Sequence, residues 1–120
     1  MKTLDTNVLV YLASGSLAAP LVVSGFFISV ISEIEALGHP KLLPSEEAKL
    51  KVILQELTVL PIDAAIKDEA IRLRRATKLR LPDAIIAATA IVTGSELLTH
   101  DAGLLNVPGL KASAPPLKQP

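Results

Sequence analysis

The chain contains no cysteine, and this absence excludes several kinds of chemistry at once. Disulfide bonds, thiolate metal sites and cysteine nucleophiles cannot form without it. The two histidines, His39 and His100, show no zinc-binding spacing and have no thiolate beside them. A chain without cysteine suits a reducing compartment, and we expect a cytoplasmic location.

Aromatic side chains are also scarce, since Tyr11, Phe26 and Phe27 are the whole complement. Proteins that bind RNA through an RNA-recognition sheet or an OB-fold stack bases on aromatic rings, so both binding modes are disfavoured. The hydrophobic half of the chain consists mostly of Ala, Val, Ile and Leu. Branched aliphatic side chains are typical of parallel sheets that are buried on both faces.

Neither sign of charge is in excess, because 12 acidic residues balance 12 basic ones. Proteins that hold nucleic acid by bulk electrostatic attraction are normally basic. Any chemistry on RNA must therefore depend on a local arrangement of charges, in which metal ions offset acidic side chains.

The stretch from Thr6 to Ser32 has no charged residue and is long enough to span a bilayer. Asn7, Pro20 and two Ser-Gly pairs interrupt it, and Asp5 stands where a signal peptide would carry basic residues. We therefore expect two short buried elements joined by a turn, and no association with a membrane.

Hydrophobic periodicity and turn residues predict strands that alternate with helices. The first expected strand ends near residue 5. The others span 26–31, 57–60, 96–99 and 109–112. The expected helices start near residues 6, 32, 44, 63 and 81, and those from 63 and 81 extend to about 79 and 93. The pattern predicts one α/β domain over 1–120, a three-layer α/β/α sandwich with a central parallel sheet of four to five strands. Residues 114–120 are expected to form a frayed tail.

Four carboxylates occupy related places on this map. Asp5 and Asp101 follow the first and fourth expected strands, and Glu35 and Asp83 lie in first turns of expected helices. Ligands of open parallel sheets bind at the carboxyl ends of the strands, where the strand order reverses. We therefore expect the four side chains to share one rim of the sheet.

Two interpretations of these carboxylates are open. Asp5, Asp83 and Asp101 could each cap a helix, and Glu35 could complete a capping box with Ser32. Alternatively the four form a metal site, because neighbouring carboxylates repel one another unless cations offset their charge. Magnesium takes oxygen ligands, keeps several waters, and can activate water for attack on a phosphodiester.

Four segments resemble the PIN-domain family, and most closely its VapC-type toxins of toxin–antitoxin pairs. They span Leu4–Leu12, Ile28–Gly38, Leu79–Ala90, and Leu97–Asp101 together with Asn106–Leu110. The third, which reads LRLPDAIIAATA, is the most specific of them. Within the second, the family spacing places the acidic residue six positions after Ser29, which selects Glu35 and not Glu33.

The resemblance implies a magnesium-dependent endoribonuclease that hydrolyses RNA as the toxin of a toxin–antitoxin pair. It implies Mg²⁺ or Mn²⁺ at four catalytic, metal-holding residues: Asp5, Glu35, Asp83 and Asp101. Thr6, Asn7 and Thr99 match accessory positions that support the acidic cluster by hydrogen bonds. The expected partners are an RNA substrate, a small inhibitory antitoxin and a second copy of the chain.

The chain departs from the family pattern in two places. Gly103 stands where many relatives carry a further acidic residue, which could weaken or remove a second metal site. The segment between Asp5 and Glu35 is short, which could open the site or change how an antitoxin grips it. Two other functions therefore stay open: a non-catalytic PIN-like module that binds RNA or protein, and a PIN nuclease of RNA processing without an antitoxin.

A basic stretch precedes Asp83 and has two interpretations. It could be a solvated helix face, or it could contact RNA phosphates or an acidic antitoxin segment. The stretch contains Arg74 and four residues expected to make such contacts: Arg72, Arg75, Lys78 and Arg80.

Overall fold

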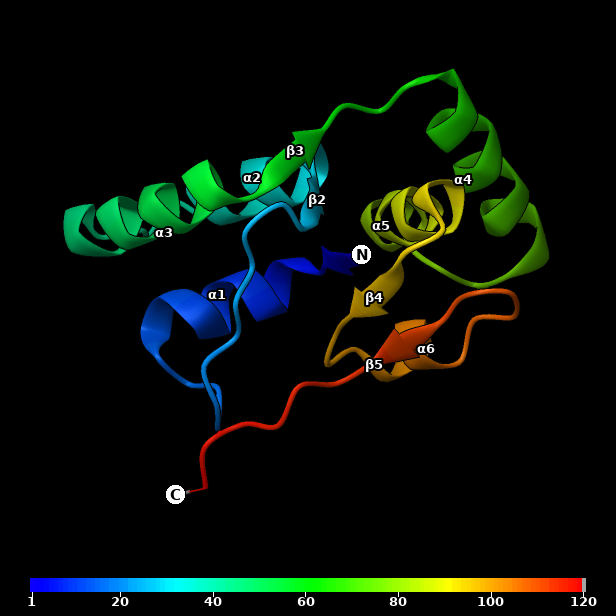
Figure 1. Cartoon of the computed structure of the whole chain (residues 1–120). Coiled ribbons are helices and arrows are strands. Elements are labelled where there is room, and N and C mark those ends of the chain that lie inside the picture. The colour runs from blue at the N-terminus through cyan, green and yellow to red at the C-terminus, as the bar shows by residue number, and fades with distance from the viewer. Residues whose placement is uncertain (120) are drawn as a thin grey trace.

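The computed structural model describes residues 1–119, and within this range a five-stranded parallel sheet forms the centre of the protein (Figure 1). The strands are β1 (Lys2–Leu4), β2 (Phe27–Ser29), β3 (Thr58–Leu60), β4 (Glu96–Leu98) and β5 (Ala112–Ser113). The helices are α1 (Thr6–Ser14), α2 (Val30–Leu37), α3 (Pro44–Glu56), α4 (Ala64–Ala76), α5 (Leu81–Thr93) and α6 (Ala102–Leu105). The strand order β3-β2-β1-β4-β5 puts β1 at the centre, with β2 on one side and β4 on the other.

Hydrophobic cores lie on both faces of the sheet. Leu4 pairs in register with Ile28 and Leu98, and these three side chains pack with α1 and α3 on one face. Leu97 points the other way and packs with α4 and α5, because successive side chains of a strand point to opposite faces. The predicted three-layer α/β/α sandwich is therefore confirmed.

Helix α5 is the most deeply buried of the helices described in residues 1–119. All seven residues from Ala84 to Ala90 are buried, and four of them are alanines, whose small side chains let the helix lie close to the sheet. The helix contacts β1, β2 and β4 as well as α4. It ends at Gly94, whose φ of 66° is a left-handed conformation that favours glycine. The prediction of a buried helix over this segment is confirmed.

Helix α2 starts earlier than predicted. Its N-cap is Ser29, whose hydroxyl accepts a hydrogen bond from the backbone N–H of Ile31 at 3.2 Å. Ser32 lies inside the helix, fully buried, so the predicted capping box of Ser32 with Glu35 is wrong. The error has a physical cause: the apolar run over 26–31 is shared by a strand and a helix, and periodicity cannot divide so short a run.

Other boundaries also shift by a few residues. Helix α4 ends at Ala76, because the Thr77 hydroxyl donates to the carbonyl of Leu73 and accepts from the N–H of Leu79. Strand β5 lies at 112–113 and not at 109–112, since Gly109, with φ of 82°, belongs to a turn.

The C-terminal segment is held to the body of the protein, contrary to the predicted frayed tail. Leu117 forms an antiparallel bridge with Leu17. The N–H of Ala18 donates to the carbonyl of Pro116, and that of Lys118 donates to the carbonyl of Ser16, both at 2.8 Å. The position at the end of the chain suggested fraying, and proline has no N–H to donate, but the Pro116 carbonyl and the Lys118 N–H are both free to pair with the loop that follows α1. Pro120, the last residue of the predicted tail, lies outside the described residues.

The long uncharged stretch is divided among α1, a connecting loop, β2 and the first three residues of α2. Among residues 1–119, no helix combines the length and the apolar character that crossing a bilayer requires.

The position of the α2 cap can be tested by substitution. Ser29→Ala removes the hydroxyl that satisfies the Ile31 N–H, so we expect the free energy of unfolding to fall by about 1 kcal/mol. Urea denaturation monitored by circular dichroism measures this change. Ser45→Ala, an exposed serine in the first turn of α3, is the matched control and should change stability little. Equal stability of the two variants would contradict the assignment of Ser29 as the cap.

Candidate active site

Asp5 follows β1 directly and is almost completely buried, with 5% of its surface exposed. Its Oδ1 accepts from the backbone N–H of Thr6 at 2.7 Å, and its Oδ2 accepts from the hydroxyl of Thr99 at 2.6 Å. Its own N–H donates to the carbonyl of Leu98. Asp5 is therefore fixed at the carboxyl ends of two neighbouring strands, β1 and β4.

Thr99 links Asp5 to Asp101. The buried Thr99 hydroxyl donates to Asp5 and accepts from the backbone N–H of Asp101 at 3.0 Å. Asp101 in turn caps α6, because its Oδ1 accepts from the N–H groups of Gly103 and Leu104 at 2.8 and 3.3 Å. One threonine thus orders two carboxylates that come from different elements.

Thr6 makes a similar link to Glu35 on α2. The Thr6 hydroxyl donates to Glu35 Oε1 at 2.8 Å and lies 2.9 Å from the hydroxyl oxygen of the buried Ser32. The side chain of Asn7, next along α1, accepts from the backbone N–H of His100 at 3.3 Å. All three predicted accessory residues, Thr6, Asn7 and Thr99, therefore contact the acidic residues or the segment that carries them.

Asp83 is the third residue of α5, in the first turn, where the helix dipole favours a negative charge. Its Oδ2 lies 3.6 Å from the Nε of Arg80, the residue that precedes the helix. This separation exceeds hydrogen-bond length, so the contact is an ion pair.

The four carboxylates interact electrostatically. Burial raises the pKa of Asp5 above its ordinary value, and repulsion from Asp83 and Asp101 adds to this effect, while hydrogen bonds from Thr99 and Thr6 oppose it. Burial also raises the pKa of Asp83, with further repulsion from Asp101 and Glu35 and an opposing effect of Arg80. The structure therefore brings Asp5, Glu35, Asp83 and Asp101 into one group, which we call the acidic cluster.

The capping interpretation explains only half of the acidic cluster. Asp5 and Asp101 do cap α1 and α6. Asp83, however, lies inside α5, where Arg80 is the N-cap residue, and Glu35 lies beyond the first turn of α2. Neither side chain makes a capping hydrogen bond, although the helix dipole does favour the charge of Asp83 in the first turn of α5.

The acidic cluster is not a closed cage. Among residues 1–119, no three His, Asp or Glu side chains converge tightly enough to enclose a cation as they stand. Each carboxylate instead turns to a nearby donor, as expected when like charges repel. The donors are nevertheless all oxygens at one edge of the sheet, and magnesium needs only a few carboxylates because it keeps several waters. The chemistry of the donors, though not their present spacing, therefore suits Mg²⁺ or Mn²⁺.

The predicted basic contacts lie in different environments. Arg72 is paired with Glu69 at 2.6 Å on α4 itself. Arg75 and Lys78 are exposed near the end of the same helix. Arg80 is the member that reaches the acidic cluster, through its ion pair with Asp83.

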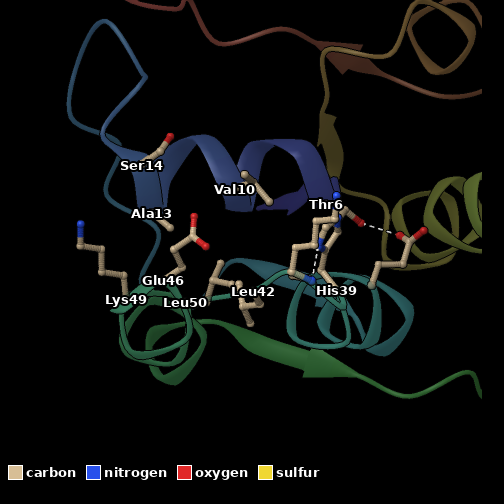
Figure 2. Close-up of a pocket in the computed structure, with 12 residues that line it drawn as sticks. Thr6, Val10, Ala13, Ser14, His39, Leu42, Glu46, Lys49 and Leu50 are labelled. Carbon is tan, nitrogen blue, oxygen red and sulfur yellow. Dashed lines mark hydrogen bonds between the residues drawn. The ribbon is translucent and has the colours of Figure 1, made fainter. Parts of the chain in front are cut away.

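A groove of about 620 Å³ opens beside the acidic cluster, bounded by α1 and α3. Figure 2 shows that it extends from Thr6 and His39 at one end to Ser14 and Lys49 at the other, with Val10 between them. Glu35 also lines it. No sequence signal indicated the groove, since its shape depends on how the helices are placed in space.

His100 lies next to Asp101 but does not present its ring to the acidic cluster through a hydrogen bond. Its ring meets Tyr11 edge-on, with 5.2 Å between centroids. Its Nε2 is buried, and no atom of residues 1–119 forms a hydrogen bond with it. The contribution of His100 that the structure shows is its backbone N–H, which binds Asn7.

Comparison with known proteins identifies the fold and its relatives. The PIN domain family model matches residues 2–110. A toxin–antitoxin complex from Klebsiella pneumoniae contains a chain that is 32% identical, with a TM-score of 0.74 over 92% of this chain and 95% of that one. VapBC2 from Rickettsia felis and VapBC from Salmonella typhimurium, both solved with DNA, have TM-scores of 0.74 at 20% and 22% identity. They cover 94% of this chain and 97% and 96% of theirs, and they show likeness of fold alone. Among curated proteins, none matches.

The raised pKa of Asp83 leads to a prediction about stability. Such a group stabilises the folded state fully below the ordinary aspartate pKa of about 3.9, and this contribution is lost as the pH rises through the raised value. In EDTA at pH 7, Asp83→Asn should therefore unfold a few degrees above the unaltered protein, and the difference should shrink toward pH 4. Thermal unfolding monitored by circular dichroism measures both values.

The exposed Asp68 on α4 supplies the control, because Asp68→Asn removes an equal charge outside the acidic cluster. It should not reproduce the pH-dependent gain. A lower unfolding midpoint for Asp83→Asn than for the unaltered protein in EDTA at pH 7 would show that the ionised Asp83 carboxylate does not destabilise the folded state.

Proposed function

The chain belongs to the PIN-domain family, and from this premise we propose that it is a magnesium-dependent endoribonuclease, the toxin of a toxin–antitoxin pair. The observation that carries the proposal is the acidic cluster. Four carboxylates from four different elements interact at the carboxyl ends of β1 and β4, and two of them have no capping role. Clustered acidic side chains of this kind favour a divalent cation.

Asp5, Glu35, Asp83 and Asp101 would hold the cation. When bound, Mg²⁺ supplies Lewis-acid stabilisation of phosphate oxygens and lowers the pKa of water. The protein supplies orientation: Thr99 and the Thr6 N–H hold the two oxygens of Asp5, and the Thr6 hydroxyl holds one oxygen of Glu35. Outer hydrogen bonds of this kind fix the direction of metal-binding carboxylates.

The charge distribution suits an RNA substrate once the acidic cluster is neutralised. The chain has no net charge, so attraction of RNA cannot come from the protein as a whole. Arg80, Arg75 and Lys78 are exposed around the start of α5 and could contact phosphates on either side of a bond held at the cluster.

The proposed partners are an antitoxin and a second copy of the chain. The relative that is 32% identical was solved as a toxin–antitoxin complex, and the groove beside Thr6 and Glu35 supplies apolar surface where an antitoxin segment would cover the acidic cluster. For a homodimer, Ile62, Ile71 and Leu81 are exposed around a second hollow beside α4 and the start of α5.

One co-expression experiment tests both partners. A short reading frame next to the gene should encode a DNA-binding antitoxin, and co-expression should yield a complex containing two copies of this chain. Mass measurement of the purified complex gives the composition. Absence of such a reading frame, together with RNA cleavage by the protein, would favour a PIN nuclease of RNA processing.

The catalytic proposal predicts that purified protein cleaves RNA with Mg²⁺ or Mn²⁺ and not with EDTA. Asp5→Asn should lower the rate by at least about 100-fold, since even outer residues of metal sites change activity by 10- to 100-fold. Gel analysis of a labelled single-stranded RNA measures cleavage. Asp68→Asn, outside the cluster, should retain full activity.

Cleavage that survives both EDTA and Asp5→Asn would refute the metal-nuclease mechanism. A folded protein that binds RNA without cleaving it under any divalent cation would instead be the non-catalytic module, which the glycine at position 103 allows.

A further inference from the structure

Arg80 differs from the other basic residues in its position. It is the N-cap residue of α5, three residues before Asp83, and its guanidinium forms an ion pair with the Asp83 carboxylate at 3.6 Å. Of the ion pairs in residues 1–119, this is the one that includes a member of the acidic cluster. Arg80 is thus a side chain of the protein itself that serves as a counter-ion to the acidic cluster.

The base of Arg80 is well fixed, while its charged end is not. The Arg80 carbonyl accepts from the N–H of Ala84 in α5, and Arg74 donates to the carbonyl of Leu79 in the preceding turn at 3.0 Å. The Arg80 side chain itself is 82% exposed, and the ion pair is longer than a hydrogen bond. Little therefore holds the guanidinium at Asp83 apart from charge.

A divalent cation at the acidic cluster would change this balance. It would take over the compensation of Asp83 and would repel the Arg80 guanidinium, which is paired with the same carboxylate. The same cation would bring a phosphodiester to the cluster. The released Arg80 guanidinium, whose backbone lies three residues before Asp83, would then be near the phosphate oxygens. Its planar arrangement of N–H donors binds such oxygens well.

We propose that Arg80 alternates between two anions: it compensates Asp83 in the metal-free protein, and it binds an RNA phosphate after a divalent cation has displaced it. This inference rests on the proposed function, because it assigns a substrate-binding residue to the proposed site. It also gives Arg80 an effect on metal affinity that a simple RNA contact would lack.

The first test measures metal binding without RNA. Isothermal titration with Mn²⁺ should show about two- to fivefold tighter binding to Arg80→Ala than to the unaltered protein, which corresponds to the range for an exposed ion pair. Arg80→Lys should bind Mn²⁺ nearly as the unaltered protein does. Lys111→Ala, which removes an exposed positive charge just before β5, is the control and should not change affinity. Unchanged or weaker Mn²⁺ binding by Arg80→Ala would overturn the counter-ion role.

The second test measures RNA. In steady-state cleavage of a single-stranded RNA, Arg80→Ala should raise KM about tenfold, as expected for a lost charge-assisted hydrogen bond, with a smaller effect on kcat. The salt dependence of log KM should weaken by about 0.7 per decade, the value for one phosphate contact to a single strand. An unchanged KM and salt slope would overturn the phosphate-binding role.

The two tests separate this inference from the proposed function. If Mn²⁺ binds to neither the unaltered protein nor its Arg80 variants, both proposals fail. If Mn²⁺ binds but RNA is not cleaved, the proposed activity fails, and fluorescence anisotropy of the same RNA with Mn²⁺ replaces KM as the measure of phosphate binding. Arg80→Ala should then weaken RNA binding about tenfold.

Discussion

Repulsion among the four carboxylates of the acidic cluster is the constraint on which the arrangement of the site depends, with Asp5 buried, Asp83 and Asp101 half-buried and Glu35 exposed. A parallel sheet directs the carboxyl ends of its strands to one edge, and here β1 and β4 place Asp5 and Asp101 there, while α2 and α5 add Glu35 and Asp83. Burial and mutual repulsion raise the pKa of Asp5 and Asp83. The hydrogen bonds from Thr6 and Thr99 and the ion pair with Arg80 are the compensation visible around them. The hydrogen bond from Thr99 costs more free energy to break than the ion pair of Arg80, because Thr99 is buried and Arg80 is exposed.

The parts of the fold that could be predicted are those that a local pattern determines. Helix α5 is apolar nearly all round and begins at Leu-Pro, so its extent and burial followed from residues 81–93 alone. The location of the acidic residues at one edge of the sheet could be predicted from the alternation of strands and helices, because the carboxyl ends of parallel strands lie at the same edge. Relation to a family added the choice of Glu35 over Glu33, and the Thr6 contact is consistent with it.

The parts that could not be predicted depend on contacts between distant segments. Ser29 and Ser32 are equally good caps by residue type, and only the end of pairing between β2 and β3 at Ser29 decides between them. The C-terminal segment is ordered by backbone bonds to residues 16 and 18, which no composition reveals. The groove beside Thr6 likewise arises from the placement of α1 against α3. Arg80 could be recognised as basic, but its pairing with Asp83 required the start of α5 to be known.

The burial of α5 has a consequence for how this protein can change over generations. The helix that carries Asp83 is also the wall between the sheet and α4, and its alanines leave no room for larger side chains. A larger side chain at Ala87 or Ala88 would therefore displace α5, and with it the Asp83 carboxylate, which lies only about one helical turn away, without altering any residue of the acidic cluster. Inheritable variation in such a protein should be concentrated in loops and exposed helix faces, where partner recognition can diverge while the acidic edge stays the same.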